Sequence, residues 1–491
     1  MRMRLVVALS VVLFLGGGEA AAQARVALPA PPTPLPAGSA IKLSDCGFAY
    51  PHAGQTSGQY MVDRDAYYAS TFLPTDIPGG HFEVRGTYPY ARWFSFEAYD
   101  EGLASQDVAD DSIIDPNPGS TNPFAPGAHR VPGHASYKLD IYTVPPDQRA
   151  NPHPHNVLYM GYRENPTYGN LEHSPYSPIL YRVYLGQHSY QGGVPVPQVY
   201  WVVDNAATNP FQNQAEVCAA EYADGGGVNQ EILALNQTLN DRFTQPTLSP
   251  AEQNVDIPTD DAPTDPPGIN VIRPATNGYQ GAYFNSRTPY TFIRPSAIYG
   301  RFLVVHFKAP TFSRIDEGIP ATGHEQTVYW SWCAAQFVSP VNITKACIPD
   351  ERFHIEDGYA TMVISPSSQR PKVHGRPYPD WMAWPGGGTD LNMREIDPNP
   401  VNFHQSPFFI PTTSSNDGLD YLLDIPFESE IKQWMGPYFP TVSYCTTRQF
   451  DKNGCGWSAA LQFRTHPSAS QKFESRSSKH KAAPRHRRTN R

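Results

Sequence analysis

The chain has 491 residues, of which 51 are proline, 12% are aromatic and only 17% are charged. This length allows two or three domains of roughly 100–200 residues each. The composition argues against a helical bundle and favours short strands joined by proline-containing turns. The formal net charge is −9, and the sequence contains no specific nucleic-acid motif.

Residues 1–24 have the pattern of a secretory signal peptide. Arg2 and Arg4 precede a short apolar run, and small residues end the segment at Ala22-x-Ala24. No later segment has the roughly 20 apolar residues that a membrane-spanning helix needs. We therefore expect a periplasmic or secreted protein without a transmembrane segment. A proline-rich linker is expected next, at residues 25–44.

Residues 45–205 are predicted to form a first β module. Its strand candidates are rich in Val, Tyr, Phe and Trp and are bounded by Pro, Gly and Asp. They are GHFEVRG, ARWFSFEAYD, YKLDIYTV, HNVLYMGYR, ILYRVYL and QVYWVV. In ARWFSFEAYD, strand alternation places Trp93 and Glu97 on one face and Phe94 and Phe96 on the other. We expect the Phe face to be core and Trp93 to face more polar surroundings.

An insert at 206–278 separates this module from a second β module at 279–466. In the insert, QAEVCAAEYA and NQEILALNQTLNDRF have helical spacing, and 244–268 is a linker rich in Pro and Asp. The tail at 467–491 has eight Lys and Arg side chains against one acidic side chain, so the rest of the chain is acidic. We expect this tail to be disordered and to contact an anionic envelope surface, with a merely solubilising role as the alternative.

The two β modules repeat similar motifs in the same order. GRFLVVHFKAP matches GGHFEVRGTYP, TVYWSWCAAQF matches ARWFSFEAYD, and GYATMVISPSSQR matches YKLDIYTVPPDQR. DWMAW then falls near HNVLYM, and LNMR falls near ILYR. This common order favours an ancient duplication over recurrent strand composition. The predicted fold is therefore mainly β, with two related β-sandwich-like modules and a short helical insert between them.

Four segments carry a resemblance to a known class of proteins. They are YPYARWFSFEAYD, DPNPGSTNPFAPGAHR, DGYATMVISPSSQRP and the Arg-containing strand ILYRVY. In these segments the chain resembles uncharacterised bacterial envelope proteins that carry a β-rich domain of unknown function. The resemblance covers much of both modules but not the insert or the tail. It implies a β-rich fold and export, and it assigns no catalytic residue.

Six cysteines in an exported protein allow up to three disulfides. Two pairs of cysteines are close in sequence, and pairing them locally would leave the remaining two for each other. This connectivity, one of 15, is Cys46–Cys218, Cys333–Cys347 and Cys445–Cys455. The absence of a C-x-x-C motif argues against a zinc ribbon or a thioredoxin-type site.

An acidic loop follows the first aromatic strand and is a candidate calcium site. Calcium takes several oxygen ligands, which clustered carboxylates can supply. The candidates are Asp107, Asp110, Asp111 and Asp115. EF-hand spacing is missing, and the alternative is a solvated loop whose aspartates serve turns and caps. His153 and His155 offer a transition-metal site, although the prolines around them predict an exposed turn.

Aromatic and arginine side chains on the strands are candidate ligand contacts. Aromatic rings can stack on sugars, and arginine can bind an anion or a carboxylate. The candidates are Trp93, Arg149, Arg182, Trp330, Arg370 and Arg394. In the alternative interpretation, the aromatic side chains fill the core and the arginines bind loop carbonyls or an acidic neighbour.

The sequence contains neither G-x-S-x-G nor H-E-x-x-H, so the local signatures of a nucleophile elbow and a zincin are missing. A catalytic group assembled from distant residues is not excluded by this. We expect an exported, non-catalytic binding protein for a polysaccharide or a small polar ligand, held between the two modules. The alternative is a secreted hydrolase or lyase that uses a metal or distant carboxylates.

Overall fold

The computed structural model describes residues 34–48, 50–53, 62–164, 171–220, 269–272, 283–293, 295, 299–338, 341–373, 375–384, 389–410 and 428–456. The predicted signal peptide, the first part of the proline-rich linker, the second insert helix at 229–243, the segment 244–268 and the basic tail lie outside these ranges. The described chain is mainly β, as predicted. The first predicted insert helix is present at 214–220.

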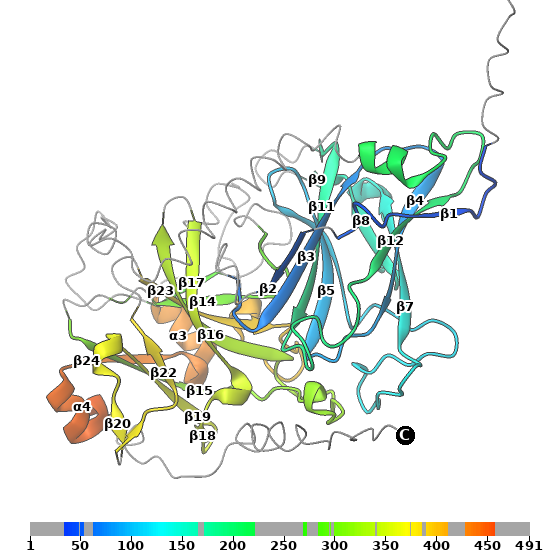
Figure 1. The fold of residues 1–491 in the computed structure, drawn as a ribbon. Helices are drawn as coiled ribbons and strands as arrows, with labels where there is room; N and C mark the ends of the chain where they lie inside the picture. Colours follow the sequence, from blue (N-terminus) through cyan, green and yellow to red (C-terminus); the bar gives the residue numbers. More distant parts are fainter. Residues whose placement is uncertain are drawn as a thin grey trace, which may run out of the picture.

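The first half of the chain forms two five-stranded sheets, which Figure 1 shows in blue to green. Sheet 1 has the order β1 (Ala40–Lys42), β12 (Gln198–Val203), β4 (Gly80–Thr87), β7 (Ser136–Thr143) and β8 (Val157–Met160). Sheet 2 has the order β2 (Tyr50–Ala53), β3 (Ala66–Pro74), β11 (Tyr176–Tyr184), β5 (Trp93–Tyr99) and β6 (Ser105–Asp110). A small separate pair is formed by β9 (Tyr162–Glu164) and β10 (Leu171–His173).

Alternating side chains of sheets 1 and 2 form the first core. In β4, Phe82 and Val84 are buried in this core, whereas His81 lies on the opposite face of the strand. Phe94 and Phe96 of β5 belong to the same core, as predicted. The two sheets therefore pack as a sandwich, and sheet 1 turns a second, polar face outward.

The second half contains two further sheets. Sheet 3 has the order β13 (Ile269–Ile272), β14 (Tyr290–Ile293), β23 (Thr389–Ile396), β16 (Tyr329–Val338) and β17 (Val341–Pro349). Sheet 4 consists of β18 (Ile355–Glu356), β19 (Tyr359–Ser365), β15 (Phe302–Lys308) and β24 (Thr441–Cys445), with β22 (Trp381–Ala383) parallel to β19. The smaller elements are the pair β20 (Lys372–Val373) and β21 (Arg376–Pro377), α3 (Glu428–Met435) and α4 (Thr447–Asn453). Apolar side chains from sheets 3 and 4 share a second core.

The strand order is the same in the two halves. The order β2-β3-β11-β5-β6 in sheet 2 corresponds to β13-β14-β23-β16-β17 in sheet 3. The order β12-β4-β7-β8 in sheet 1 corresponds to β24-β15-β19-β22 in sheet 4, and the last pair is parallel in both. This agreement supports the duplication that the sequence predicts. The duplication itself stays a prediction.

The outer faces of sheets 2 and 3 meet in a third cluster of buried side chains. Trp93 and Tyr184 come from sheet 2, and Tyr329 and Ile396 come from sheet 3. The rings of Tyr184 and Tyr329 lie 5.4 Å apart between centroids. Trp93 therefore faces a buried hydrophobic contact between the halves, and not the more polar surroundings that its strand pattern predicts.

All six cysteines are paired, and the predicted connectivity is confirmed. The disulfides are Cys46–Cys218, Cys333–Cys347 and Cys445–Cys455. Each of them joins residues of the same half. Among the helices that the structure describes, none combines the length and apolar character needed to cross a bilayer.

Candidate functional site

A cavity of about 290 Å³ lies at one end of the first sandwich, beside the loop that joins β3 to β4. Buried core side chains line its interior: Phe82, Ile141, Met160 and Trp201. More accessible polar side chains also line it: Asp76, His81, Tyr142 and Thr143. Its volume is near the lower end of the roughly 300–1,000 Å³ of ligand pockets, so it suits a small ligand.

The β3–β4 loop is shaped by residues that tolerate unusual backbone conformations. Asp76 has φ 57° and Gly79 has φ 84°, in the left-handed region that glycine and aspartate adopt most readily. At Gly80, a Cβ atom would lie 2.2 Å from the carbonyl oxygen of Val202 and 2.6 Å from the ring of Trp201. Glycine therefore allows β4 to begin directly against β12, beside the cavity.

His81 is the best-placed ionisable side chain of the cavity. Its Nδ1 lies 3.0 and 2.9 Å from the two carboxylate oxygens of Asp204, and its Nε2 lies 3.6 Å from Oδ1 of Asp140. The imidazole stacks on the ring of Tyr142, with 4.7 Å between centroids. Burial lowers the pKa of His81, but the carboxylates of Asp140 and Asp204 outweigh it and the pKa lies above its ordinary value.

A row of charged side chains continues from His81 along the outer face of sheet 1. Glu83 of β4 lies opposite Asp140 of β7 in the strand register. Nζ of Lys138 lies 3.0 Å from Oε2 of Glu83 and 3.0 Å from Oδ1 of Asp140. Burial raises the pKa of Asp140, but His81 and Lys138 outweigh it and hold the pKa below its usual range. This face is therefore charged and ordered by cross-strand pairs.

A second histidine–carboxylate pair borders the same cavity. Nε2 of His173 lies 2.8 Å from Oδ2 of Asp76, and the hydroxyl of Tyr162 donates to Oδ1 of Asp76 over 3.3 Å. The Asp76 side chain is 51% exposed. This carboxylate can therefore accept hydrogen bonds from a ligand without leaving its place.

The predicted tryptophan contacts are not accessible. Trp93 and Trp330 both have 0% exposure. Trp93 lies in the cluster between the halves, and Trp330 lies in the second core, where its indole nitrogen donates to the carbonyl of Pro310 over 3.0 Å. The interpretation that aromatic side chains fill the interior is correct for these two residues.

Arg182 and Arg394 are also buried, with exposures of 2% and 1%. Arg182 forms an ion pair with Glu97 and donates to the carbonyl of Tyr283 over 2.9 Å. Nε of Arg394 lies 3.6 Å from Oδ2 of Asp63. Both arginines therefore pair with acidic groups inside the protein instead of facing an open ligand surface.

Arg149 and Arg370 occupy equivalent places, each after a short 3-10 helix. Arg149 donates to three main-chain carbonyls and stacks over Tyr159, and Arg370 donates to the carbonyl of Tyr378 and stacks over Trp381. These contacts agree with the alternative that each arginine fixes a loop. We therefore remove all six predicted contacts from the candidate site.

Three of the four predicted calcium ligands have separate side-chain partners, and the fourth, Asp111, is buried. Asp107 accepts from Nε2 of His153 and Asp115 from Nδ1 of His155, over 2.9 and 3.0 Å, and Asp110 forms an ion pair with Arg287. Burial and the adjacent Asp110 raise the pKa of Asp111 well above its ordinary value. Within the described ranges, these four carboxylates do not form a group with ligand atoms within 4.8 Å of one another. Nor do the two histidines converge, since each has its own aspartate.

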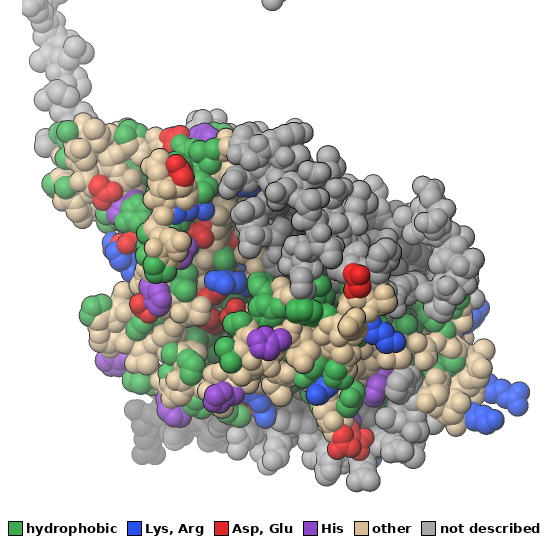
Figure 2. Space-filling model, turned by 180° about the vertical axis from the view of Figure 1, so that it is seen from behind, with side chains coloured by type: hydrophobic (Ala, Val, Ile, Leu, Met, Phe, Trp, Pro, Cys, Tyr) green, Lys and Arg blue, Asp and Glu red, His purple; other side chains and the backbone are tan. Residues whose placement is uncertain are grey.

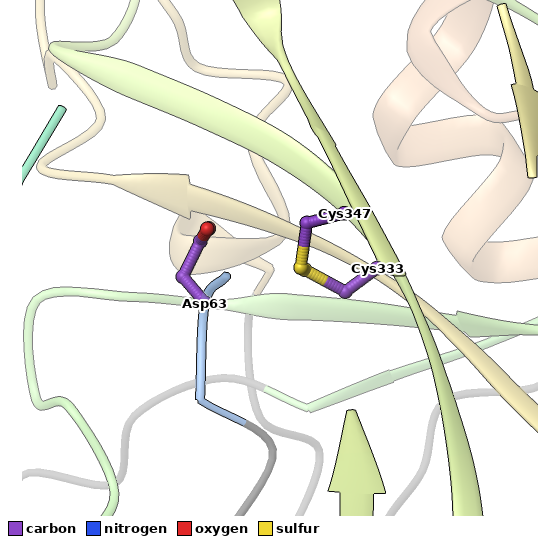
Figure 3. A group of neighbouring side chains, drawn as sticks. All are labelled: Asp63, Cys333 and Cys347. Carbon is purple, nitrogen blue, oxygen red and sulfur yellow. A yellow bond between two sulfur atoms is a disulfide. The ribbon is translucent and has the colours of Figure 1, made fainter. Parts of the chain in front are cut away.

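Three other groups of metal-ligating residue types do come together in the described part of the chain. In the first, Asp63 lies beside Cys333 and Cys347 (Figure 3), but a disulfide joins the two sulfur atoms and Asp63 accepts from Tyr329 and Ser331. In the second, which is Asp316, Glu317 and Glu351, the fully buried guanidinium of Arg92 already supplies a cation that cannot move aside into solvent. The third group is His81, Glu83 and Asp140, beside the cavity.

The comparisons with known proteins assign neither a family nor a function to the chain. No protein-family model and no curated protein matches the chain. An uncharacterized protein from Burkholderia cenocepacia is similar over 72% of this chain and 79% of its own, with 11% identity and a TM-score of 0.39. A protein from Vibrio parahaemolyticus is similar over 71% and 89%, with 11% identity and a TM-score of 0.33.

Surface charge does not single out another site on the face drawn in Figure 2. Acidic, basic and histidine side chains are scattered there among hydrophobic ones, over the part that the structure describes. A broad surface of one charge would have indicated a polyanionic or polycationic partner. The cavity beside His81 is therefore the strongest candidate for a functional site.

Proposed function

We propose that this chain is an exported, non-catalytic binding protein for a small polyhydroxylated ligand of about the size of one sugar ring. The cavity beside His81 is the observation that supports this proposal. It is lined by both polar and apolar side chains, as small-molecule sites are. The proposed location is the end of the first sandwich, and it replaces the cleft between the modules that the sequence suggested.

The chemistry of the cavity favours hydroxyl groups over a strongly charged ligand. Asp76 offers carboxylate oxygens that accept hydrogen bonds, Thr143 can donate or accept, and the ring of Tyr142 offers an apolar face. Imidazole and carboxylate groups alternate around it, because His81 and His173 each pair with a carboxylate. A ligand with many hydroxyl groups and no net charge fits this balance.

The proposal is tested by measuring the binding of a panel of monosaccharides to the mature protein by ligand-observed NMR and thermal shift. For any monosaccharide that binds, we expect Tyr142→Ala to raise the dissociation constant at least about tenfold. Each tenfold change in the dissociation constant corresponds to only about 1.4 kcal/mol of binding free energy. Asp76→Asn is expected to weaken it as well. Tyr200→Ala is the matched control, because Tyr200 is on the same outer face of sheet 1 but does not line the cavity.

Either of two results would contradict the proposal. One is that no monosaccharide in the panel binds to the folded protein. The other is that Tyr142→Ala and Tyr200→Ala weaken binding equally, which would place the ligand elsewhere on the sheet.

A further inference from the structure

Three side chains on the outer face of sheet 1 form a set of metal ligands. His81 and Glu83 are two residues apart in β4, so both project to the same face, and Asp140 is the register partner of Glu83. One ligand atom from each lies within 4.8 Å of the others. We propose that His81, Glu83 and Asp140 bind a divalent transition-metal ion such as zinc, for which imidazole and carboxylate are suitable ligands.

The imidazole of His81 is already oriented for this role. Its Nδ1 is held by the carboxylate of Asp204 at 2.9 and 3.0 Å, so in the neutral imidazole the proton lies on Nδ1 and the lone pair on Nε2. Histidine ligands of metals almost always have such an outer partner, which fixes the ring and raises the basicity of the ligand. Asp204 would therefore act as a positioning residue and would not touch the ion.

The distance between two of the ligand atoms fits a shared ion better than a hydrogen bond. Nε2 of His81 and Oδ1 of Asp140 lie 3.6 Å apart, which is too long for a hydrogen bond. Two ligands at about 2.1 Å from a tetrahedral zinc ion lie about 3.4 Å apart. The observed separation is therefore close to that of two ligands of one ion.

Lys138 lies between the two carboxylates that would bind the ion. Its ammonium group lies 3.0 Å from both carboxylates, and its side chain is 44% exposed. A metal ion must displace this ammonium, which is free to move toward solvent because the lysine chain is long and partly exposed. Three protein ligands would leave a coordination position open, as in catalytic zinc sites. The metal site shares His81 with the cavity, but it does not depend on the proposed sugar.

The direct test is calorimetric titration of the metal-free mature protein with zinc ions, without any sugar. We expect one equivalent to bind and to raise the melting temperature. His81→Gln is expected to lower the zinc affinity at least about tenfold, and Asp204→Asn about 10–100-fold, while the metal-free melting temperature of Asp204→Asn stays near that of the parent. Lys138→Met is expected to raise the affinity.

His155→Gln is the matched control, because His155 also has its Nδ1 on a carboxylate oxygen, that of Asp115 at 3.0 Å, but belongs to no group of three possible ligands among the described residues. Its zinc affinity should equal that of the parent. Glu83→Gln provides a second ligand variant if His81→Gln does not fold. Tyr142→Ala removes a wall of the cavity but no metal ligand, so it should keep the zinc affinity and separates this inference from the sugar proposal.

Three outcomes would overturn the inference. The first is the absence of stoichiometric zinc binding to the parent protein. The second is equal zinc affinity in His81→Gln and His155→Gln. The third is an unchanged affinity in Lys138→Met, which would show that the ion does not lie between Glu83 and Asp140.

Discussion

Arg92 is a fully buried charge in the contact between the halves. It lies in the first half, has no exposed side-chain surface, and pairs with Asp316, Asp350 and Glu351 of the second half. Burial raises the pKa of Asp350 to about 7 and that of Glu351 to about 7, although Arg92 opposes this effect. One guanidinium therefore compensates several carboxylates that the fold has removed from water.

Replacing Arg92 with methionine is expected to destabilise the protein in a pH-dependent way. Breaking a buried pair typically costs about 3–5 kcal/mol, because the remaining charges have no partner. Between pH of about 4 and 7, a carboxyl group whose pKa is raised on folding is still protonated in the folded protein but has lost its proton in the unfolded chain. The contribution of this group to the free energy of unfolding therefore falls as the pH rises through this range. The loss in free energy of unfolding should therefore be larger at pH 8 than at pH 5, as measured by denaturant titration.

Arg314→Met is the control for this experiment, because Arg314 pairs with Glu317 at the surface and its side chain is 43% exposed. We expect it to cost less than about 1 kcal/mol at either pH. If Arg92→Met lowers the free energy of unfolding equally at pH 5 and pH 8, Arg92 does not act by compensating the charge of these carboxylates.

At the scale of single elements, helix α4 covers the outer face of sheet 4 and buries it. Phe450 of α4 is fully buried and stacks on Phe302 of β15, with 5.4 Å between the ring centroids. A capping box formed by Thr446 and Gln449 starts the helix. The outer face of sheet 4 is therefore apolar and covered, whereas the outer face of sheet 1 carries charged side chains.

We expect Phe450→Ala to lower the free energy of unfolding by about 3–5 kcal/mol, the usual cost of removing a buried phenylalanine. Thr446→Ala, which removes only the cap, should cost about 1 kcal/mol. Thermal or denaturant unfolding of the whole protein measures the loss of stability in each of the two variants. If the two variants lose the same stability, the packing of α4 on β15 is not the main contribution of this helix.

The sequence predicts strands better than it predicts how they are paired. Alternation correctly places Phe94 and Phe96 on one face of the strand and Trp93 on the other, because successive side chains of a strand point to opposite faces. The motif alignment matches β4 with β15 and β7 with β19, but the register differs by two residues. Phe82 lies opposite Ile141, whereas Leu303 lies opposite Ile364 and not the aligned Met362. The order of the motifs does not determine this offset, because the offset depends on how the paired strands are placed against each other.

The candidate site was missed for a similar reason. His81 and Glu83 share a face by simple alternation, which the sequence shows, but Asp140 and Asp204 come from distant strands that only the register brings together. The predicted arginines failed because a strand pattern does not distinguish a charge that faces solvent from one that is paired inside the protein. The cysteines were predictable because two of the pairs are local in the sequence.

At the scale of the whole molecule, the two halves are joined by packing and ion pairs but by no disulfide. A specific protease site inserted within residues 244–268 would cut the chain between them. We expect the two fragments to elute together in gel filtration, because the cluster around Tyr184 and Tyr329 and the Arg92 ion pairs hold them. They should separate on a denaturing gel without reductant, since each disulfide lies within one fragment.

The same cleaved protein with Arg92→Met is expected to dissociate at a lower denaturant concentration. Arg314→Met again provides the comparison. Fragments that separate in native buffer, before any substitution, would show that the contact between the halves depends on the uncut chain.

The third cluster has one further consequence, which concerns the history of the chain. Trp93 lies opposite Tyr184 in sheet 2, and the aligned residues Tyr329 and Ile396 lie opposite each other in sheet 3. Aligned positions therefore belong to one contact, which is the arrangement of an isologous interface around a two-fold axis. If the predicted duplication took place, we expect that a single-module ancestor paired with a second copy of itself through this face. The two outer sheets lie outside this contact and were then able to diverge, and they do differ: sheet 4 has a covering helix, whereas sheet 1 has charged side chains beside a cavity.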